Sequence, residues 1–561
     1  MLKDSTPTPT APDFRRELSF LIGLTLLAGL LRLALIGDKT VWLDEAFSIW
    51  IARHDLWELW GWLIRIDQHP PLYYTLLHFW VRIFGDLQSA VRTLSALCST
   101  LAVPVFYAGI RRLTDRPTAL IAAFILAISP FHIRYAQEAR MYGLLTLAVA
   151  AALYFVAVIL NAEARRPRGP EAGEGVGLFH WWGLAVSQAA VMLTHNTAAV
   201  YFPVALNLAL ALIFFNAETQ RRRDAEATDL IRVNPPNSRH PRSILRSGFG
   251  WRWLLFQGIA LLLWSTWAWP FVVQSIGVDR HFWLWPPTVE MVRDTFRNFN
   301  FSFLPDDLPF QTGWMVLYAG LALVGFWRLR RTSAPWLLGT LLVAPMAIAL
   351  LVSLRRPIFY DRTLIWITLP YYALIAAGIR GIGDGGLGIG DWGYLWQSRI
   401  SNLFAVGLLP GRVLQVGLLA IILFLSGLSL NGYYFWFEKE GWDEAAVYVA
   451  ENAQPDDLIV FNASWVQIPF EYYYRHYSLE TELRGLPVDL FDRGVLEPTM
   501  ETSDIPHLHE LVDGRSRVWL VYSHDWYTDP GAIIPREIGL SLRELGRKQF
   551  TGLQVIRYQA R

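Results

Sequence analysis

Long apolar runs separated by short polar stretches dominate the chain as far as residue 430. A run of about 20 apolar residues is long enough to cross the hydrocarbon core of a membrane as a helix. The pattern predicts a mainly α, polytopic transmembrane domain over residues 17–430, after a cytoplasmic tail at residues 1–16. We expect eleven spans, near residues 17–36, 89–110, 118–131, 141–160, 177–193, 197–215, 253–275, 312–327, 335–353, 363–379 and 411–430.

The pattern changes after residue 431. The stretch "WDEAAVYVAENAQPDDLIVF" is typical of a helix, a Gln-Pro-Asp-Asp turn and an apolar strand, and "SRVWLVYSH" (516–524) of a second buried strand. A small soluble α/β domain is therefore predicted over residues 431–561.

Arginines in the short loops between the expected spans indicate the orientation, because cytoplasmic loops are enriched in Lys and Arg. These loops alternate with others and would all lie on one side, together with the Arg-rich stretch 216–252. The arginines are Arg111, Arg112, Arg116, Arg165, Arg166, Arg168, Arg328, Arg330 and Arg331. With the N-terminus inside, the C-terminal domain lies outside. The expected outer loops are 37–88, 132–140, 194–196, 276–311 and 354–362.

Composition agrees with a membrane protein, since 53% of the 561 residues are hydrophobic and only 17% are charged. The mean hydropathy is +0.29. A net charge of +1 gives no sign of a nucleic-acid partner. The single cysteine, Cys98, lies in an apolar run and is expected to pack there, which excludes a disulfide framework and a cysteine metal site.

The first outer loop, residues 37–88, combines aromatic residues with an acidic pair. Its aromatic residues have the spacing of amphipathic helices in the membrane interface, where indole rings prefer to lie. They are Trp42, Phe47, Trp50, Trp57, Trp60 and Trp62. Asp44 and Glu45 can be solvated interface charges, or acids favoured at a helix start. They can equally be the carboxylates of an active site.

The loop "SLRRPIFYDRTLIW" (353–366) places Arg355, Arg356 and Arg362 on the side that should be poor in cations. One interpretation is that they pair with Asp361 or with lipid headgroups. The other is a phosphate site at the outer boundary of the membrane, because guanidinium groups match phosphate oxygens.

Several stretches, taken in order, resemble a known family. They are "LDEAFSIWIA", "HPPLYYTLLHFW", "RTLSAL", "SPFHIRYAQEARMYGLL", "LTHNTAAVYF" and "FYDRTLIWITLP". This set is similar to the dolichyl-phosphate-mannose protein mannosyltransferases and their bacterial relatives that modify lipid A with aminoarabinose. The resemblance covers most of the first 200 residues and one later segment. The family often has Arg-Tyr where this chain has Arg362-Thr363.

The resemblance implies a membrane glycosyltransferase of the C fold that takes its sugar from a polyprenyl phosphate and inverts configuration without a covalent nucleophile. Asp44 then corresponds to the base that takes the proton of the acceptor hydroxyl, and Glu45 is a second catalytic candidate that orients the acceptor or a cation. The chemistry agrees, since glycosyl transfer needs a base and a cationic site for the departing phosphate.

Other motif residues are candidates for binding substrate. His69 either binds the sugar or acceptor or caps the turn made by the two prolines after it. Glu138 and Arg140 either form an ion pair at a helix start or contribute Arg140 to the phosphate site. His195 makes either a structural hydrogen bond or a substrate contact. The same motifs add Tyr73 and Tyr142 to the substrate-binding candidates.

No metal-ligand spacing supports a metal site, and no cofactor is expected, although a divalent cation is compatible with the His, Glu and Asp residues. The expected partners are a polyprenyl-phosphate sugar, an acceptor of undefined class (protein, lipid or envelope glycan) and membrane lipids. The expected location is a plasma membrane, the bacterial inner membrane, with the site outside.

Two other classes of protein are alternatives. A transporter would show paired repeats, and the sequence shows no obvious similarity between the two halves of its membrane part. A polyprenyl-lipid binding or transport protein without transferase activity would keep the arginines but has no need of the carboxylate pair.

Overall fold

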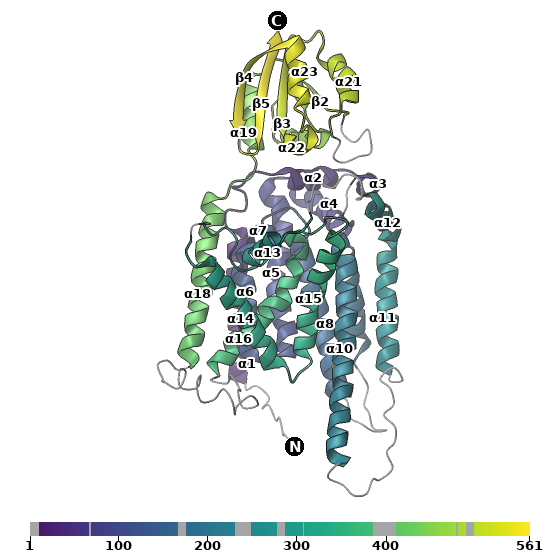
Figure 1. Ribbon diagram of the computed structural model, residues 1–561, viewed down its shortest axis with the longest axis vertical. Coiled ribbons are helices and arrows are strands. Elements are labelled where there is room, and N and C mark those ends of the chain that lie inside the picture. Colours follow the sequence, from purple (N-terminus) through teal and green to yellow (C-terminus); the bar gives the residue numbers. More distant parts are fainter. Residues whose placement is uncertain are drawn as a thin grey trace.

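The computed structural model of the protein describes residues 11–66, 69–165, 176–229, 248–277, 286–306, 308–384, 411–477, 481–489 and 499–561. A bundle of long helices forms one part, and a small α/β domain stands on one end of the bundle (Figure 1). Arg166, Arg168 and residues 230–247 of the Arg-rich stretch 216–252 lie outside the described residues.

Every expected span coincides with a helix of the bundle. The helices are α1 (Ala11–Leu33), α5 (Gln88–Leu113), α6 (Arg116–Ile128), α8 (Tyr142–Arg165), α9 (Leu178–Met192), α10 (Asn196–Asp229), α11 (Gly248–Trp264), α14 (Gln311–Leu329), α15 (Ala334–Ser353), α16 (Thr368–Gly383) and α18 (Gly411–Asn431). Among the described residues, eight helical segments are long and apolar enough to cross a membrane. A ninth is the pair of α6 and α7 (Pro130–Ala136), bent by 54°. The expected mainly α, multi-pass fold is confirmed, while α1 and α9 do not meet this criterion.

The bend between α6 and α7 has a local cause. Pro130 begins α7 and has no N–H, so it cannot continue the hydrogen bonds of α6. The buried guanidinium of Arg32 in α1 fills the gap, donating to the carbonyls of Ala127 at 2.9 Å and Leu126 at 3.1 Å. The predicted span 118–131 is therefore a helix that ends inside the bundle and turns.

Short helices form a layer between the bundle and the α/β domain (Figure 1). They are α2 (Leu43–Arg53), α3 (Leu56–Arg65), α4 (Leu72–Phe84), α7, α12 (Ala268–Gly277), α13 (Val289–Phe301) and the 3₁₀ segments η2 (Ser265–Trp267) and η3 (Asp361–Ile367). In α3, Trp57 is 90% exposed while Leu59 and Leu63 are buried, which confirms the amphipathic helices expected in the first loop.

The C-terminal domain contains a five-stranded mixed sheet in the order β2-β1-β3-β5-β4. Its strands are β1 (Leu458–Phe461), β2 (Glu482–Gly485), β3 (Arg517–Ser523), β4 (Leu542–Phe550) and β5 (Leu553–Ala560). β1 pairs in parallel with β2 and β3, and β5 runs antiparallel to β3 and β4. Its helices are α19 (Trp442–Asn452), η6 (Ser464–Val466), α20 (Gln467–Tyr474), η7 (Thr502–Asp504), α21 (Ile505–Val512), α22 (Asp525–Thr528) and α23 (Ile533–Ser541). The π-helical turn η5 (Gly432–Trp436) continues α18 in the last candidate span.

Both faces of this sheet are covered, which explains why its central strands are continuous apolar runs. Ile459 and Trp519 belong to one buried cluster, with Trp442 of α19 and Phe470 of α20. Their neighbours along the strands pack on the other face, against α21 and α23. The two strands predicted in this region are therefore confirmed.

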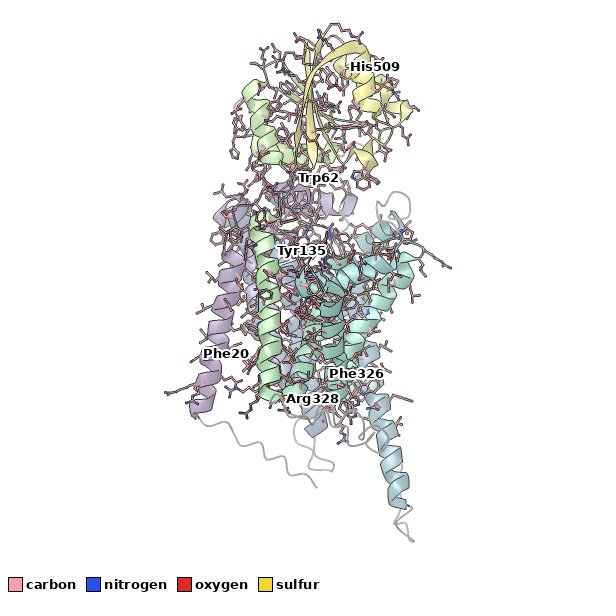
Figure 2. All side chains as sticks on the ribbon, turned by 60° about the vertical axis from the view of Figure 1, so that its left-hand side comes forward. Phe20, Trp62, Tyr135, Phe326, Arg328 and His509 are labelled. Atoms are coloured by element: carbon pink, nitrogen blue, oxygen red, sulfur yellow. The ribbon has the colours of Figure 1, made fainter. Side chains whose placement is uncertain are left out.

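Those orienting arginines that lie within the described residues are at the end of the bundle away from the C-terminal domain. Figure 2 shows Arg328 at that end and His509 at the opposite one. Arg328 pairs with Asp115 at 3.0 Å and with Asp384 at 2.9 Å. The layer of short helices is therefore on the side opposite to these arginines.

Candidate functional site

Asp44 and Arg362 meet at the boundary between the bundle and the short-helix layer. Asp44 lies in the first turn of α2, and Arg362 lies in η3, directly before α16. Nη1 of Arg362 donates to Oδ2 of Asp44 at 2.9 Å. Nη2 of Arg140 lies 3.9 Å from the same oxygen. The Asp44 side chain is 22% exposed, so a ligand can still reach it.

Two opposing effects act on the Asp44 carboxyl. Burial disfavours the charged form, but the guanidinium groups of Arg140 and Arg362 outweigh it and hold the pKa below the usual 3.8. Asp44 is therefore an ionised carboxylate at neutral pH. While it is paired in this way, it is also a weak base.

Arg140, between α7 and α8, extends its guanidinium group over α2 and α4. It donates to the carbonyl of Asp44 at 3.3 Å, to the hydroxyl of Ser48 at 3.4 Å and to that of Tyr74 at 3.1 Å. Its other terminal nitrogen lies 3.5 Å from Nε2 of His69. The structure thus brings Arg140 and His69 to Asp44, as the sequence motifs led us to expect.

Tyr73 is placed behind Arg140. Its buried hydroxyl forms a 2.8 Å hydrogen bond with the hydroxyl of Ser95, which donates to the main-chain carbonyl of Arg140 at 2.9 Å. Tyr73 therefore supports the backbone of Arg140 and has no direct contact with Asp44.

His195 and Tyr142 extend the site on the other side of His69. The rings of His69 and His195 meet edge to face, with centroids 5.4 Å apart, and the Tyr142 ring lies 6.4 Å from that of His195. Nδ1 of His195 accepts the backbone N–H of Thr197 at 3.3 Å. Nε2 of His195 is buried and has no hydrogen-bond partner among the described residues.

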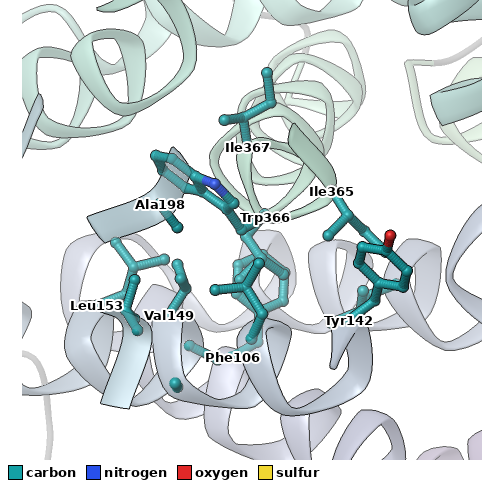
Figure 3. Close-up of a cluster of buried hydrophobic side chains, with 14 of the residues drawn as sticks. Phe106, Tyr142, Val149, Leu153, Ala198, Ile365, Trp366 and Ile367 are labelled. Carbon is teal, nitrogen blue, oxygen red and sulfur yellow. The ribbon is translucent and has the colours of Figure 1, made fainter. Parts of the chain in front are cut away.

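A buried apolar cluster holds these polar groups in place. Figure 3 shows Phe106 of α5, Val149 and Leu153 of α8, Ala198 of α10 and Trp366 of η3 packed together. Arg140 precedes α8, His195 precedes α10, and Arg362 lies four residues before Trp366. Close packing of these elements therefore fixes the relative positions of the three side chains.

Glu45 differs from its neighbour Asp44, because it is fully buried. Its two oxygens accept from Nε and Nη2 of Arg92, both at 2.8 Å, and one also accepts from Lys439 at 2.8 Å. The backbone N–H of Ala139 donates to it at 2.9 Å. Burial disfavours its charge, but Arg92 and Lys439 lower the pKa of Glu45 to about 2. Glu45 therefore ties α2 to α5, to the α7–α8 loop and to the segment that leads into the C-terminal domain.

Glu138 belongs to the same buried group of charges. It is 1% exposed, and Oε1 lies 3.5 Å from Nε of Arg134 and 4.0 Å from Nζ of Lys439. We call Glu45, Glu138, Arg92, Arg134 and Lys439 the buried ion network. Glu138 thus forms an ion pair with Arg134 and not with Arg140.

Arg355 and Arg356 lie away from Asp44. Arg355 is exposed, and Arg356 donates to the carbonyl of Ser275 in α12 at 2.7 Å. Asp361 accepts from the side chain of Asn298 at 2.6 Å and from the backbone N–H of Arg362 at 2.6 Å. Of the three arginines in this loop, the structure brings Arg362 to the site.

Sequence reasoning missed Arg92 and Lys439. Arg92 carried a signal, because it is a charged residue in an apolar span and it begins the stretch "RTLSAL". Lys439 follows the last span and no pattern distinguishes it. In the part of the chain that the structure describes, no group of three or more His, Cys, Asp or Glu side chains is suited to a metal ion.

Solved structures share the fold of this helical bundle and its C-terminal domain. The chain is similar to ArnT from Cupriavidus metallidurans, crystallised with undecaprenyl phosphate, at 14% identity over 96% of this chain and 97% of that one, with a TM-score of 0.54. It is also similar to the archaeal oligosaccharyltransferase AglB from Archaeoglobus fulgidus, solved with an inhibitory peptide and a dolichol-phosphate, at 14% identity over 97% of this chain and 74% of that one, with a TM-score of 0.53. The protein therefore has the C fold of membrane glycosyltransferases.

The sequence comparison is narrower. Residues 68–224 match the family described as dolichyl-phosphate-mannose-protein mannosyltransferase. The matched segment includes His69, Arg140 and His195 and ends before Arg362. A search of curated proteins gave no match. The family resemblance expected from the sequence is confirmed.

Proposed function

We propose that this protein transfers a glycosyl group from a polyprenyl-phosphate-linked sugar to a hydroxyl of an acceptor. The proposal rests chiefly on one observation, the 2.9 Å contact between the Asp44 carboxylate and the Arg362 guanidinium, with Arg140 beside them. A carboxylate can take the hydroxyl proton, and guanidinium groups suit phosphate oxygens. The two groups that the reaction needs meet at the boundary of the membrane domain, where a lipid phosphate would lie.

In this mechanism the acceptor oxygen attacks the anomeric carbon from the side opposite to the phosphate. The bond between that carbon and the phosphate oxygen breaks, and its electron pair stays on the phosphate. Asp44 takes the proton of the attacking hydroxyl, while Arg362 and Arg140 stabilise the charge on the leaving phosphate. A single displacement of this kind inverts the configuration of the sugar.

The ion pair gives the mechanism an order of events. The donor phosphate and the Asp44 carboxylate are both anions, so they compete for the guanidinium groups. Arg140 and Arg362 both lower the pKa of Asp44, so when the phosphate takes Arg362, Asp44 loses one of these two cations and its pKa rises. Asp44 thus becomes a better base when the donor is in place.

The comparisons support the choice of donor class. ArnT was crystallised with undecaprenyl phosphate and AglB with a dolichol-phosphate, and both are polyprenyl phosphates. The arginine-poor side that carries the site corresponds to the outer face of a plasma membrane under the positive-inside rule. We assign the protein to a bacterial inner membrane, with a protein, a lipid or an envelope glycan as its acceptor.

The test combines two measurements. Purified protein in detergent is incubated with short-chain polyprenyl-phosphate sugars and envelope acceptors, and products are followed by mass spectrometry, with Asp44→Asn as the matched control. Envelope glycans and lipids are compared in cells with and without the protein. Transfer by the wild type alone supports the proposal. A donor that binds but is never consumed, with an unchanged envelope, would instead identify a polyprenyl-lipid binding or transport protein.

A further inference from the structure

His195 is the N-cap residue of α10, and this role fixes its ring. Its carbonyl accepts the backbone N–H of Ala199 at 2.9 Å, the first hydrogen bond of the helix. Its Nδ1 accepts the backbone N–H of Thr197 at 3.3 Å and lies 2.9 Å from the Thr197 hydroxyl. A nitrogen that accepts an N–H carries no proton itself. Nδ1 is therefore the unprotonated nitrogen of the ring.

The His195 ring is neutral. Burial disfavours the charged form, and His69, Arg140 and Arg362 nearby add to this effect, so the pKa of His195 lies well below 6.5. A neutral imidazole holds one proton, and with Nδ1 accepting, that proton is on Nε2. The cap thus selects one tautomer, with an N–H at Nε2.

This N–H is left without a partner. His195 is only 4% exposed, and its Nε2 finds no acceptor among the described residues. A buried donor without a partner costs about 1–3 kcal/mol. The capping role accounts for Nδ1 but not for the burial of an unsatisfied Nε2, which suggests that a ligand supplies the missing acceptor.

We infer that His195 donates its Nε2 hydrogen to an oxygen of the lipid phosphate of the donor. This inference rests on the proposed function. His195 adjoins His69, which is 3.5 Å from Arg140, so the N–H lies in the same layer as the two guanidinium groups. Arg140 and Arg362 lie beside Asp44, and guanidinium groups suit the oxygens of a phosphate. His195 adds a hydrogen bond to this anion site without adding a charge.

Two substitutions separate the cap from the proposed donor. Asparagine is among the best N-cap residues, so His195→Asn keeps the cap and removes only the Nε2 donor. His195→Gln can place an amide N–H near the position of Nε2 but is a poor cap. We expect His195→Asn to have a melting temperature close to that of the wild type. Its affinity for the lipid phosphate should be about tenfold to a hundredfold lower, as expected for a lost hydrogen bond to a charged group. We expect His195→Gln to show the opposite pattern, with lower melting temperature and better lipid affinity than His195→Asn.

The experiment measures binding of a short-chain polyprenyl monophosphate without sugar to the full-length protein in detergent. The affinity ratio of wild type to His195→Asn should stay constant from about pH 8 to about pH 6.5, because the donor is neutral throughout. Equal affinities of the wild type and His195→Asn would show that His195 only caps α10. A loss confined to the sugar-bearing lipid would move the contact to the sugar and overturn the inference. A wild type that does not bind the monophosphate would overturn the proposed function as well.

Discussion

Arg362 and Asp44 stand 318 positions apart in the chain, yet the guanidinium group of one donates to the carboxylate of the other at 2.9 Å. The pair joins α2 of the first loop to η3, which directly precedes α16. In the proposed reaction these two side chains have separate tasks. The unliganded protein therefore keeps its base and its phosphate-binding group neutralised by each other.

The first prediction concerns Asp44→Asn. The amide keeps the size of the side chain but cannot take a proton, so transfer should fall by about 10²–10⁴-fold, as expected for a lost general base. The same change removes the competitor for Arg362, so a polyprenyl monophosphate should bind at least as tightly as to the wild type. Turnover and lipid affinity are measured on the purified protein. Near-normal turnover would exclude Asp44 as the base.

The second prediction concerns Arg362 and Arg140. Replacing either by Ala should weaken donor binding by about tenfold to a hundredfold, since a hydrogen bond to a charged group is worth about 1.5–3 kcal/mol. Arg362→Lys should rescue only partly, because an ammonium group cannot form two parallel bonds to phosphate. Arg355→Ala, an exposed arginine in the same loop, is the control and should leave donor affinity unchanged. Unchanged affinity in both Ala variants would place the phosphate elsewhere.

The third prediction is a pH dependence. The carboxylate form of Asp44 is the active one, and its pKa in the free protein is below 3.8, so kcat/KM should have no acidic limb from Asp44 near neutral pH. Arg362→Ala removes a cation that lowers this pKa while burial continues to raise it. The acidic limb of the residual activity should therefore move to higher pH in Arg362→Ala. An identical pH profile in wild type and variant would contradict the coupling of the two residues.

The fourth prediction concerns the buried ion network. Glu45→Gln removes the carboxylate that pairs with both Arg92 and Lys439 and leaves these two cations buried. The free energy of unfolding should therefore fall by about 3–5 kcal/mol. Lys439→Met should cost less, since Arg92 still neutralises Glu45. Melting temperatures in detergent test this order, with Lys548→Met, an exposed lysine of β4, as the control.

The same network has a defined acid sensitivity. The pKa of Glu45 is about 2 in the folded protein, below the usual 4.5. Its contribution to stability is therefore fully present above pH 4.5 and is lost as the pH falls towards 2. A loss of stability above pH 5 that disappears in Glu45→Gln would contradict this assignment.

The fifth prediction is topological. In a Cys98→Ser background, Trp57→Cys in α3 and Leu545→Cys in β4 should react with an impermeant maleimide added to intact cells. Arg112→Cys, at the other end of the bundle, should react only after the membrane is opened. All three positions are exposed in the structure. Labelling of intact cells at residue 112 alone would show that the protein has the opposite orientation in the membrane.

The membrane helices and the candidate site could be predicted to different extents from the sequence. Apolar runs determine where helices can cross a membrane, so every expected span coincides with a helix. Pro130 is a local signal for the bend, but the carbonyls of Leu126 and Ala127 beside it accept from Arg32, about 95 positions away in the chain. No local pattern contains such a contact.

Asp44 and Glu45 show the limit of sequence reasoning most clearly. They are adjacent acids in one helix turn, and at the level of the sequence only the family resemblance, which gives Asp44 the role of base, separates them. The structure turns Asp44 towards Arg362 and Glu45 towards Arg92 and Lys439. Their different environments come from partners far away in the chain, including one in the segment after the last span.

The position of Lys439 in the chain has a consequence for biosynthesis. Glu45 belongs to the first loop made by the ribosome, and Arg92 becomes available soon afterwards, but Lys439 is synthesised 394 residues after Glu45. Until then the buried carboxylate lacks one of its two cations, and a buried charge that is incompletely paired is costly. The ion pairs that anchor the first loop are therefore complete only when the whole membrane domain has been inserted. A chain that stops early leaves α2, and Asp44 with it, without the contact that completes its anchoring.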